Sequence, residues 1–162
     1  MRKEIKKLIV ATMSMALVLG VGNTVNIKAG TESKIKAESF CFEIKSHCAA
    51  SRNPGSIKRT SHKTDNAWSV DFRKSNESGS GRTSTRFYLG KVIPNHTNEY
   101  GSALHTIQEG SGNKYYSAYS KVCPATVCLY GRDNDDGTSE KYTVSGYWSP
   151  QTGHDPTNDG DK

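Results

Sequence analysis

The stretch Trp68-Ser69-Val70-Asp71-Phe72 carries the strongest fold signal in this chain, because large apolar and polar side chains alternate along it. A period of two places the apolar side chains on one face of a β-strand and the polar ones on the other. The pattern recurs at residues 40–44, 87–89 and 142–148, less regularly in the last of these. These segments are therefore predicted to be half-buried strands.

Three further segments of β-forming composition lie at residues 103–108, 114–121 and 126–131. Clusters of Gly, Pro, Asn and Asp separate nearly all of the segments, as turns do between strands. Outside the N-terminal region no stretch has helical periodicity. About seven short strands with glycine-rich turns predict an all-β fold, a single antiparallel β-sandwich.

The N-terminal region predicts export by a signal helix. Residues 1–7 hold four basic residues and one Glu, and residues 8–22 form an apolar run, as in a secretory signal peptide. The run is shorter than the roughly 20 residues that a membrane span needs. We place the cleavage after Ala29, because a second cleavage pattern at residues 35–37 lies too far from the run. The protein is therefore expected to be extracellular, without a stable membrane span.

Cleavage changes the charge of the protein. Removal of residues 1–29 takes away five of 22 basic and one of 16 acidic residues, which leaves 17 and 15 and lowers the net charge from +6 to +2. Nucleic-acid binding needs a clustered basic face on the mature protein, so it is not expected. Residues 30–92 carry 12 basic and 6 acidic groups. This excess of basic residues is expected either for a surface that contacts anionic envelope polymers or lipids, or for an ordinary solvated surface of mixed charge.

The expected mature chain of 133 residues is one domain in size and can bury a single core without a cofactor or metal. Both of its ends are polar and poor in large apolar residues. We predict a flexible leader at residues 30–38, the β-sandwich domain at 39–150 and a disordered polar tail at 151–162.

The four cysteines, at positions 41, 48, 123 and 128, predict two disulfides in an exported chain. A zinc site is the competing interpretation, but neither pair has Cys-x-x-Cys spacing. The nested pairing of Cys41 with Cys128 and Cys48 with Cys123 is favoured, because nearly constant index sums of 169 and 171 fit an antiparallel strand pair. The local pairing of Cys41 with Cys48 and Cys123 with Cys128 stays open.

The sequence contains few motifs that are typical of catalytic sites. Ser33 and Ser111 each begin a Ser-x-x-Lys match without a supporting second motif. His96 and His105 could each partner a nucleophilic Ser, but the sequence has no Gly-x-Ser-x-Gly motif that would present one. Four acidic residues around Gly137, within residues 133–140, favour a hairpin turn over a calcium loop, because the Gly falls one place early for an EF-hand. The sequence therefore identifies no catalytic or metal-binding residue.

The later part of the chain is rich in Tyr and Trp. Trp68, Tyr142 and Trp148 suit the core of a sandwich. Tyr115 and Tyr116 are adjacent, so they point to opposite faces of a strand, and at least one of them must leave the core.

An outward Tyr offers stacking area, and Arg offers forked donors to phosphate or carboxylate groups. We therefore take Tyr115 and Tyr116, together with Arg82, Arg86 and Lys91, as candidate ligand-binding residues. The alternative is that both Tyr residues lie on the surface of a sheet and bind no ligand.

Several motifs together resemble the DUF2712 family, small exported proteins of Gram-positive bacteria whose function is unknown. They are Gly110-Ser111-Gly112, the Tyr-Tyr-Ser-Ala-Tyr of residues 115–119, Val127 and Leu129 before Asp133-Asn134, and the closing segment from Thr143 to Pro150. The resemblance runs from about Phe40 through Asn66-Ala67-Trp68 to Pro150, and its specific part is the closing Ser-Gly-Tyr-Trp. It implies export and no assigned activity. The four cysteines are not part of the family pattern.

A shorter motif, Ser117-Ala118-Tyr119-Ser120 followed by Ala125-Thr126-Val127, is similar to the lactococcin 972 type of bacteriocin. That resemblance implies a small exported β-sandwich that binds a cell-wall precursor.

Two functional classes follow. The first is a secreted non-enzymatic β-sandwich, bacteriocin-like or envelope-binding, whose partner is a cell-envelope polymer or a lipid-linked precursor. The alternative is a small secreted hydrolase with an acid or base of shifted pKa in a pocket. Since no catalytic constellation is recognisable, the sequence favours binding.

Overall fold

Ten β-strands and one short 3-10 helix form the part of the chain that the computed structural model describes, residues 34–45, 50–77, 82–94, 99–134 and 141–156. The strands are β1 (Glu38–Ile44), β2 (Ser51–Arg52), β3 (Ile57–Arg59), β4 (Trp68–Ser75), β5 (Ser84–Lys91), β6 (Glu99–Tyr100), β7 (His105–Gln108), β8 (Asn113–Tyr116), β9 (Ala125–Asp133) and β10 (Tyr142–Ser149). The 3-10 helix, η1, is Ser120–Val122.

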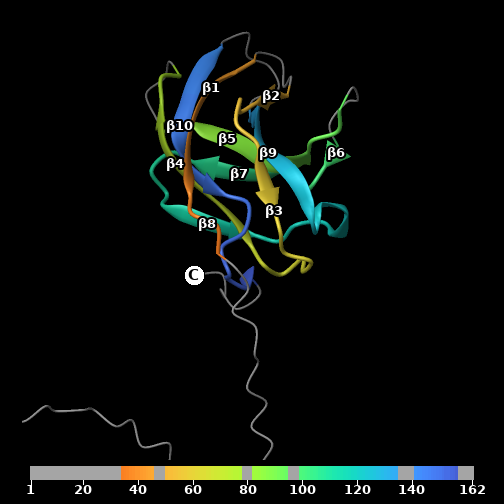
Figure 1. Cartoon of the computed structure of the whole chain (residues 1–162). Coiled ribbons are helices and arrows are strands. Elements are labelled where there is room, and N and C mark those ends of the chain that lie inside the picture. Colours follow the sequence, from red (N-terminus) through yellow and green to blue (C-terminus); the bar gives the residue numbers. More distant parts are fainter. Residues whose placement is uncertain (1–33, 46–49, 78–81, 95–98, 135–140, 157–162) are drawn as a thin grey trace, which may run out of the picture. The chain divides into compact units, whose positions relative to one another are not determined.

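The strands make two antiparallel sheets that pack face to face (Figure 1). The four-stranded sheet has the order β1-β10-β4-β8. The six-stranded sheet has the order β2-β9-β5-β6, with β3 also paired to β9 and β7 to β5. The predicted all-β antiparallel sandwich is therefore confirmed.

Each of the seven segments predicted from the sequence contains a strand, and three strands were not predicted. The unpredicted strands β2, β3 and β6 have only two or three residues, too few to show a period of two. The segment predicted at residues 114–121 is a strand only as far as Tyr116 and continues into η1.

The alternating apolar residues fill the space between the sheets. Phe87 of β5 packs against Phe40 of β1 and Phe72 of β4, with ring centroids 5.7 and 5.4 Å apart. Trp68 and Trp148 are also buried, as expected. Burying each such side chain contributes about 1.5–3 kcal/mol, so these contacts dominate the stability of the sandwich.

The predicted ends of the domain need correction. The Ile35 N–H donates to the Gln151 carbonyl at 3.1 Å, and β1 begins at Glu38, so the domain includes part of the predicted leader. Gln151 is fully buried, and the Ala67 N–H donates to the His154 carbonyl at 2.8 Å. Polar composition suggested a loose tail from residue 151, but residues 151–154 bond to the domain. The predicted signal peptide at residues 1–29 lies outside the described residues.

Candidate functional site

A groove lies on the outer face of the four-stranded sheet. It consists of two pockets of about 360 and 350 Å³ that share Ala37, Ser69 and Asn113 among their lining residues. We call them the His154 pocket and the Tyr147 pocket after a residue that each contains. Because Trp68, Val70 and Phe72 of β4 point into the core, the residues between them line the outer face.

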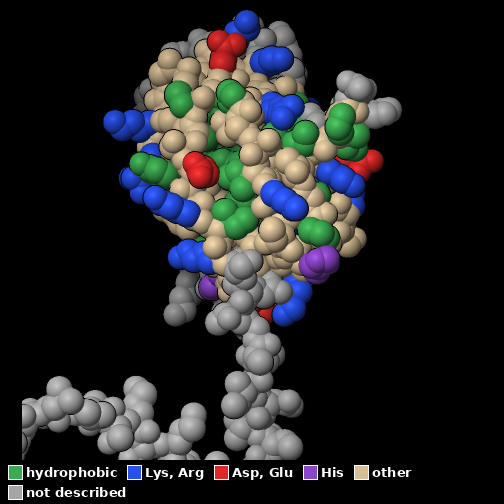
Figure 2. Space-filling model, viewed as in Figure 1, with side chains coloured by type: hydrophobic (Ala, Val, Ile, Leu, Met, Phe, Trp, Pro, Cys, Tyr) green, Lys and Arg blue, Asp and Glu red, His purple; other side chains and the backbone are tan. Residues whose placement is uncertain are grey.

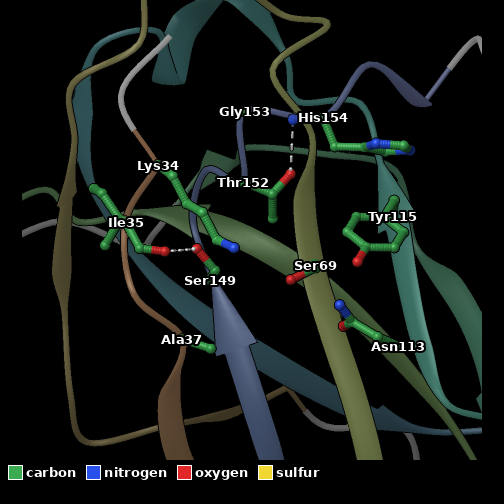
Figure 3. A pocket seen from close by; sticks show the side chains of 10 residues that line it. All are labelled: Lys34, Ile35, Ala37, Ser69, Asn113, Tyr115, Ser149, Thr152, Gly153 and His154. Atoms are coloured by element: carbon green, nitrogen blue, oxygen red, sulfur yellow. Dashed lines mark hydrogen bonds between the residues drawn. The ribbon is translucent and has the colours of Figure 1, made fainter. Parts of the chain in front are cut away.

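The His154 pocket lies between the segment before β1 and the turn after β10 (Figure 3). The Ser149 hydroxyl donates to the Ile35 carbonyl at 2.8 Å and so joins the two walls. Lys34 extends its side chain from the first wall into the pocket (Figure 3).

Two buried amide side chains hold the turn after β10 in place. Asn66 Oδ1 accepts hydrogen bonds from the N–H groups of Thr152 and Gly153, at 3.1 and 2.8 Å. Gln151 Oε1 accepts from the N–H groups of residues 60 and 61, at 2.8 Å each. A buried polar group left without a partner costs about 1–3 kcal/mol, so these bonds fix the backbone of the pocket wall.

Arg59 lies beneath the same turn and is fully buried. Its guanidinium donates to the carbonyl oxygens of Pro150, Lys63 and Asn66, the last two at 2.8 and 2.6 Å. The guanidinium therefore ties the loop before β4 to the end of β10.

Tyr115 and His154 form the wall that faces Lys34, with their ring centroids 4.6 Å apart (Figure 3). The Asn113 amide and the Ser69 hydroxyl lie next to Tyr115 in the same pocket (Figure 3). The pocket thus combines aromatic surface with several hydrogen-bonding groups, a combination typical of sites for small polar ligands.

The Tyr147 pocket combines an exposed ring with an ion pair. The Tyr147 side chain is 43% exposed, and the Arg73 guanidinium lies 4.6 Å from the centroid of its ring. Arg73 Nε donates to Asp71 Oδ2 at 2.7 Å. Residues 144 and 145 pair with Ser75 and Lys74, whereas Gly146 pairs with Phe72, so Arg73 is the extra residue of a β-bulge. Such a bulge redirects the side chain that it carries.

The two neighbouring tyrosines predicted as site residues point to opposite faces of β8. Tyr116 faces the core, where its ring stacks on His105 at 3.7 Å and lies 5.3 Å from Trp68. Burial raises the pKa of the Tyr116 hydroxyl and lowers the pKa of His105. Tyr115 lines the groove, so only one of the pair is placed to contact a ligand there.

The predicted basic residues lie in a different part of the molecule from Tyr115. Arg86 and Lys91 belong to β5 of the six-stranded sheet, and Arg82 lies in the segment before this strand. Arg86 pairs with Arg132 across the sheet and donates to the Asn134 carbonyl at 2.7 Å. Lys and Arg are spread over the face drawn in Figure 2 rather than gathered in one patch. The structure therefore does not bring the predicted residues together into one site.

The predicted disulfide between Cys41 and Cys128 is absent, because Cys41, Cys123 and Cys128 are free thiols. Cys41 lies on the exposed face of β1, whereas Cys128 is buried beside Tyr88 and Tyr130 on the outer side of the six-stranded sheet. The index-sum argument assumed that these residues lie on paired strands, but β1 pairs with β10 and β9 pairs with β5. Cys48 lies outside the described residues, and Cys123, its predicted partner, is free.

Within the described ranges, no group of three or more His, Cys, Asp and Glu side chains is close enough to hold a metal ion. Asp133, from the predicted turn at residues 133–140, is buried and accepts a hydrogen bond from the Tyr142 hydroxyl at 3.4 Å. Residues 135–140 lie outside the described part of the chain. No helix in the described part of the chain has the length and apolarity of a membrane span.

Most of the groove was not predicted from the sequence. The unpredicted lining residues with polar, charged or aromatic side chains are Lys34, Ser69, Asp71, Arg73, Asn113, Tyr147, Ser149, Thr152 and His154. One signal was present: Ser69, Asp71 and Arg73 alternate with the apolar residues of β4 and so share its outward side.

No protein-family model, curated protein or solved structure matches this chain. Its class is therefore defined by the fold and the site, an antiparallel β-sandwich with a polar and aromatic groove on the outer face of one sheet.

Proposed function

We propose that this protein is a secreted, non-enzymatic β-sandwich that binds a saccharide chain of the cell envelope in the groove of the four-stranded sheet. The observation that carries the proposal is the arrangement of Tyr115 and Tyr147 on the two sides of β4. Tyr115 pairs with Ser69, and Tyr147 pairs with Asp71, so the two rings flank a strip of polar side chains.

The spacing of the two rings favours an elongated ligand. Their strands, β8 and β10, are the two neighbours of β4, so they lie about 10 Å apart in the sheet. Sugar rings have apolar faces and polar edges. A saccharide chain can stack on both tyrosines while its hydroxyl groups bond to Ser69, Asp71 and Asn113.

The ion pair in the groove favours binding over hydrolysis. Asp71 is an acidic lining residue of the Tyr147 pocket, and Arg73 binds its carboxylate at 2.7 Å. General acid or base catalysis needs a carboxyl group positioned to exchange a proton with the substrate. A carboxylate held by an Arg is better suited to accepting hydrogen bonds from hydroxyl groups.

Secretion of the protein from the cell is part of the proposal. The predicted signal peptide at residues 1–29 supports export, and the resemblance of residues 143–150 to exported Gram-positive proteins is in keeping with it. The intact mass of the protein in the culture medium tests this part, since cleavage after Ala29 gives a chain that begins at Gly30.

Co-sedimentation with purified Gram-positive cell-wall sacculi tests the binding. Tyr147→Ala should weaken the affinity for sacculi by about five- to tenfold, because an aromatic contact contributes on the order of 1 kcal/mol beyond its buried area. Tyr119→Ala is the matched control, because Tyr119 is 45% exposed, also has a basic side chain near its ring and lies outside the groove. Equal binding by the two variants would contradict the proposed site.

A further inference from the structure

The two pockets of the groove differ in charge. In the Tyr147 pocket, Asp71 and Arg73 neutralise each other through a contact of 2.7 Å. The lining of the His154 pocket contains Lys34 and His154 but no Asp or Glu. A ligand in the groove therefore meets a compensated ion pair in one pocket and a cation in the other.

The position of Lys34 is set by the backbone next to it. Ile35 donates through its N–H to the Gln151 carbonyl at 3.1 Å and accepts at its carbonyl from the Ser149 hydroxyl at 2.8 Å. These two bonds hold the segment against the turn after β10. The Lys34 side chain reaches into the pocket, with its nitrogen between Ser149 and Ser69 (Figure 3).

A second cation lies behind the wall of the same pocket. Arg59 is fully buried, and its guanidinium binds the carbonyl oxygen of Pro150, the residue that follows Ser149. Its other oxygen partners, at Lys63 and Asn66, are also carbonyl groups rather than carboxylates. A buried charge surrounded by dipoles acts over a longer distance than one in water, so Arg59 adds positive potential at this end of the groove.

We infer that the His154 pocket binds an anionic group carried by the saccharide chain, a carboxylate or a phosphate. Lys34 supplies the cation that faces this group, and the Asn113 amide and the Ser69 hydroxyl are the neutral donors beside it. This inference rests on the proposed function and narrows its ligand to an acidic saccharide chain. It also orients the chain, with the anionic group at the Lys34 end and a neutral ring over Tyr147.

The test compares Lys34→Gln with Lys36→Gln in the secreted protein. Lys36 is an exposed residue of the same segment and lines neither pocket, so Lys36→Gln removes the same charge two residues away. Both variants and the parent are titrated against three sacculus preparations. These are untreated sacculi, sacculi freed of phosphodiester-linked polymers by hydrofluoric acid, and sacculi whose carboxyl groups are amidated.

Lys34→Gln should bind untreated sacculi about fivefold more weakly than the parent, as expected for an ion pair of about 1 kcal/mol at an accessible site. Lys36→Gln should bind like the parent. For the parent and Lys36→Gln, one of the two chemical treatments should weaken binding to a similar extent as Lys34→Gln does. The treatment that has this effect identifies the bound anion as a phosphate or a carboxylate. Lys34→Gln should lose less affinity than the parent on the same treatment, because only the contacts of the anion with Asn113 and Ser69 remain to be lost.

Two results would overturn the inference while leaving the proposed function in place. One is equal binding of untreated sacculi by Lys34→Gln and Lys36→Gln. The other is parent binding that neither chemical treatment changes. If the folded parent binds none of the three preparations, the proposed function itself fails and the inference fails with it.

Discussion

Gly146 of β10 lies directly against the backbone of Asp71 on β4. A Cβ atom added to Gly146 would stand 1.9 Å from the Asp71 carbonyl oxygen and 3.0 Å from the Phe40 ring. This close approach occurs at the bulge that carries Arg73. The absence of a side chain at Gly146 therefore allows the backbone geometry that places Asp71 and Arg73 in the groove.

Gly146→Ala should destabilise the protein by about 3 kcal/mol, because the backbone oxygen that it meets cannot move without separating the two strands. Gly55→Ala is the control, since its added Cβ would meet only the Asn53 amide nitrogen at 3.4 Å, an ordinary contact. That control should change stability by less than about 0.5 kcal/mol. Urea denaturation measures both values. Equal stability of the two variants would show that the strands at Gly146 are not packed as described.

The adjacent tyrosines of β8 should respond differently to truncation. Tyr116→Ala removes the ring stacked on His105 and should cost about 2 kcal/mol of folding free energy. Tyr115→Ala should cost less than about 1 kcal/mol, because its ring lies on the outer face, yet it should weaken binding to sacculi. Thermal unfolding and co-sedimentation of both variants provide the comparison. The reverse order of stability would mean that β8 is rotated relative to the core.

The stability of the protein should fall in mild acid, in part because of His105. Burial lowers the pKa of His105 below its ordinary value of 6.5, so the unfolded chain binds a proton that the folded protein excludes. The free energy of unfolding should therefore decrease as the pH falls below about 6.5. His105→Phe keeps a ring against Tyr116 and should show a smaller decrease from pH 7 to pH 5. Identical pH profiles for parent and variant would exclude this contribution of His105.

The free thiols should differ in reactivity. Cys41 is exposed on β1 and should be alkylated rapidly in the folded protein. Cys128 is buried, and desolvation raises the pKa of its thiol, so it should react only after unfolding. Peptide mass mapping after timed alkylation without a reductant follows each cysteine separately. Protection of Cys41 that a reductant relieves would instead indicate a disulfide.

The alternation of apolar residues was enough to predict the sandwich, and the reason is local. In β4 and β1 each large side chain lies two positions from the next, and this spacing alone assigns Trp68, Phe72, Phe40 and Ile44 to the core side. The pairing of strands depends instead on contacts between distant segments. The pairing of β1 with β10 could therefore not be predicted from the local pattern, and the predicted link between Cys41 and Cys128 was wrong for that reason.

The site was harder to predict because its walls come from polar segments. Asn66 and Gln151 have side chains that the composition assigns to loops and tails, yet both are buried. Asn66 accepts from backbone N–H groups of the pocket wall, and Gln151 accepts from those of residues 60 and 61 and so anchors the turn after β10. Such bonds depend on the tertiary position of the backbone. Tyr115 and Tyr116 were both predicted as candidates, because adjacent residues of a strand face opposite ways, a rule that needs only the strand itself. Which of the two faces outward depends on the packing of β8 and was not predicted.

The most direct test of the central claim is an NMR titration of the ¹⁵N-labelled protein with soluble fragments of digested sacculi. The account predicts that the largest shift changes fall on groove residues, including the backbone N–H groups of Ser69, Asn113, Tyr147 and Gly153. Changes confined to the six-stranded sheet, around Arg86 and Arg132, would contradict it.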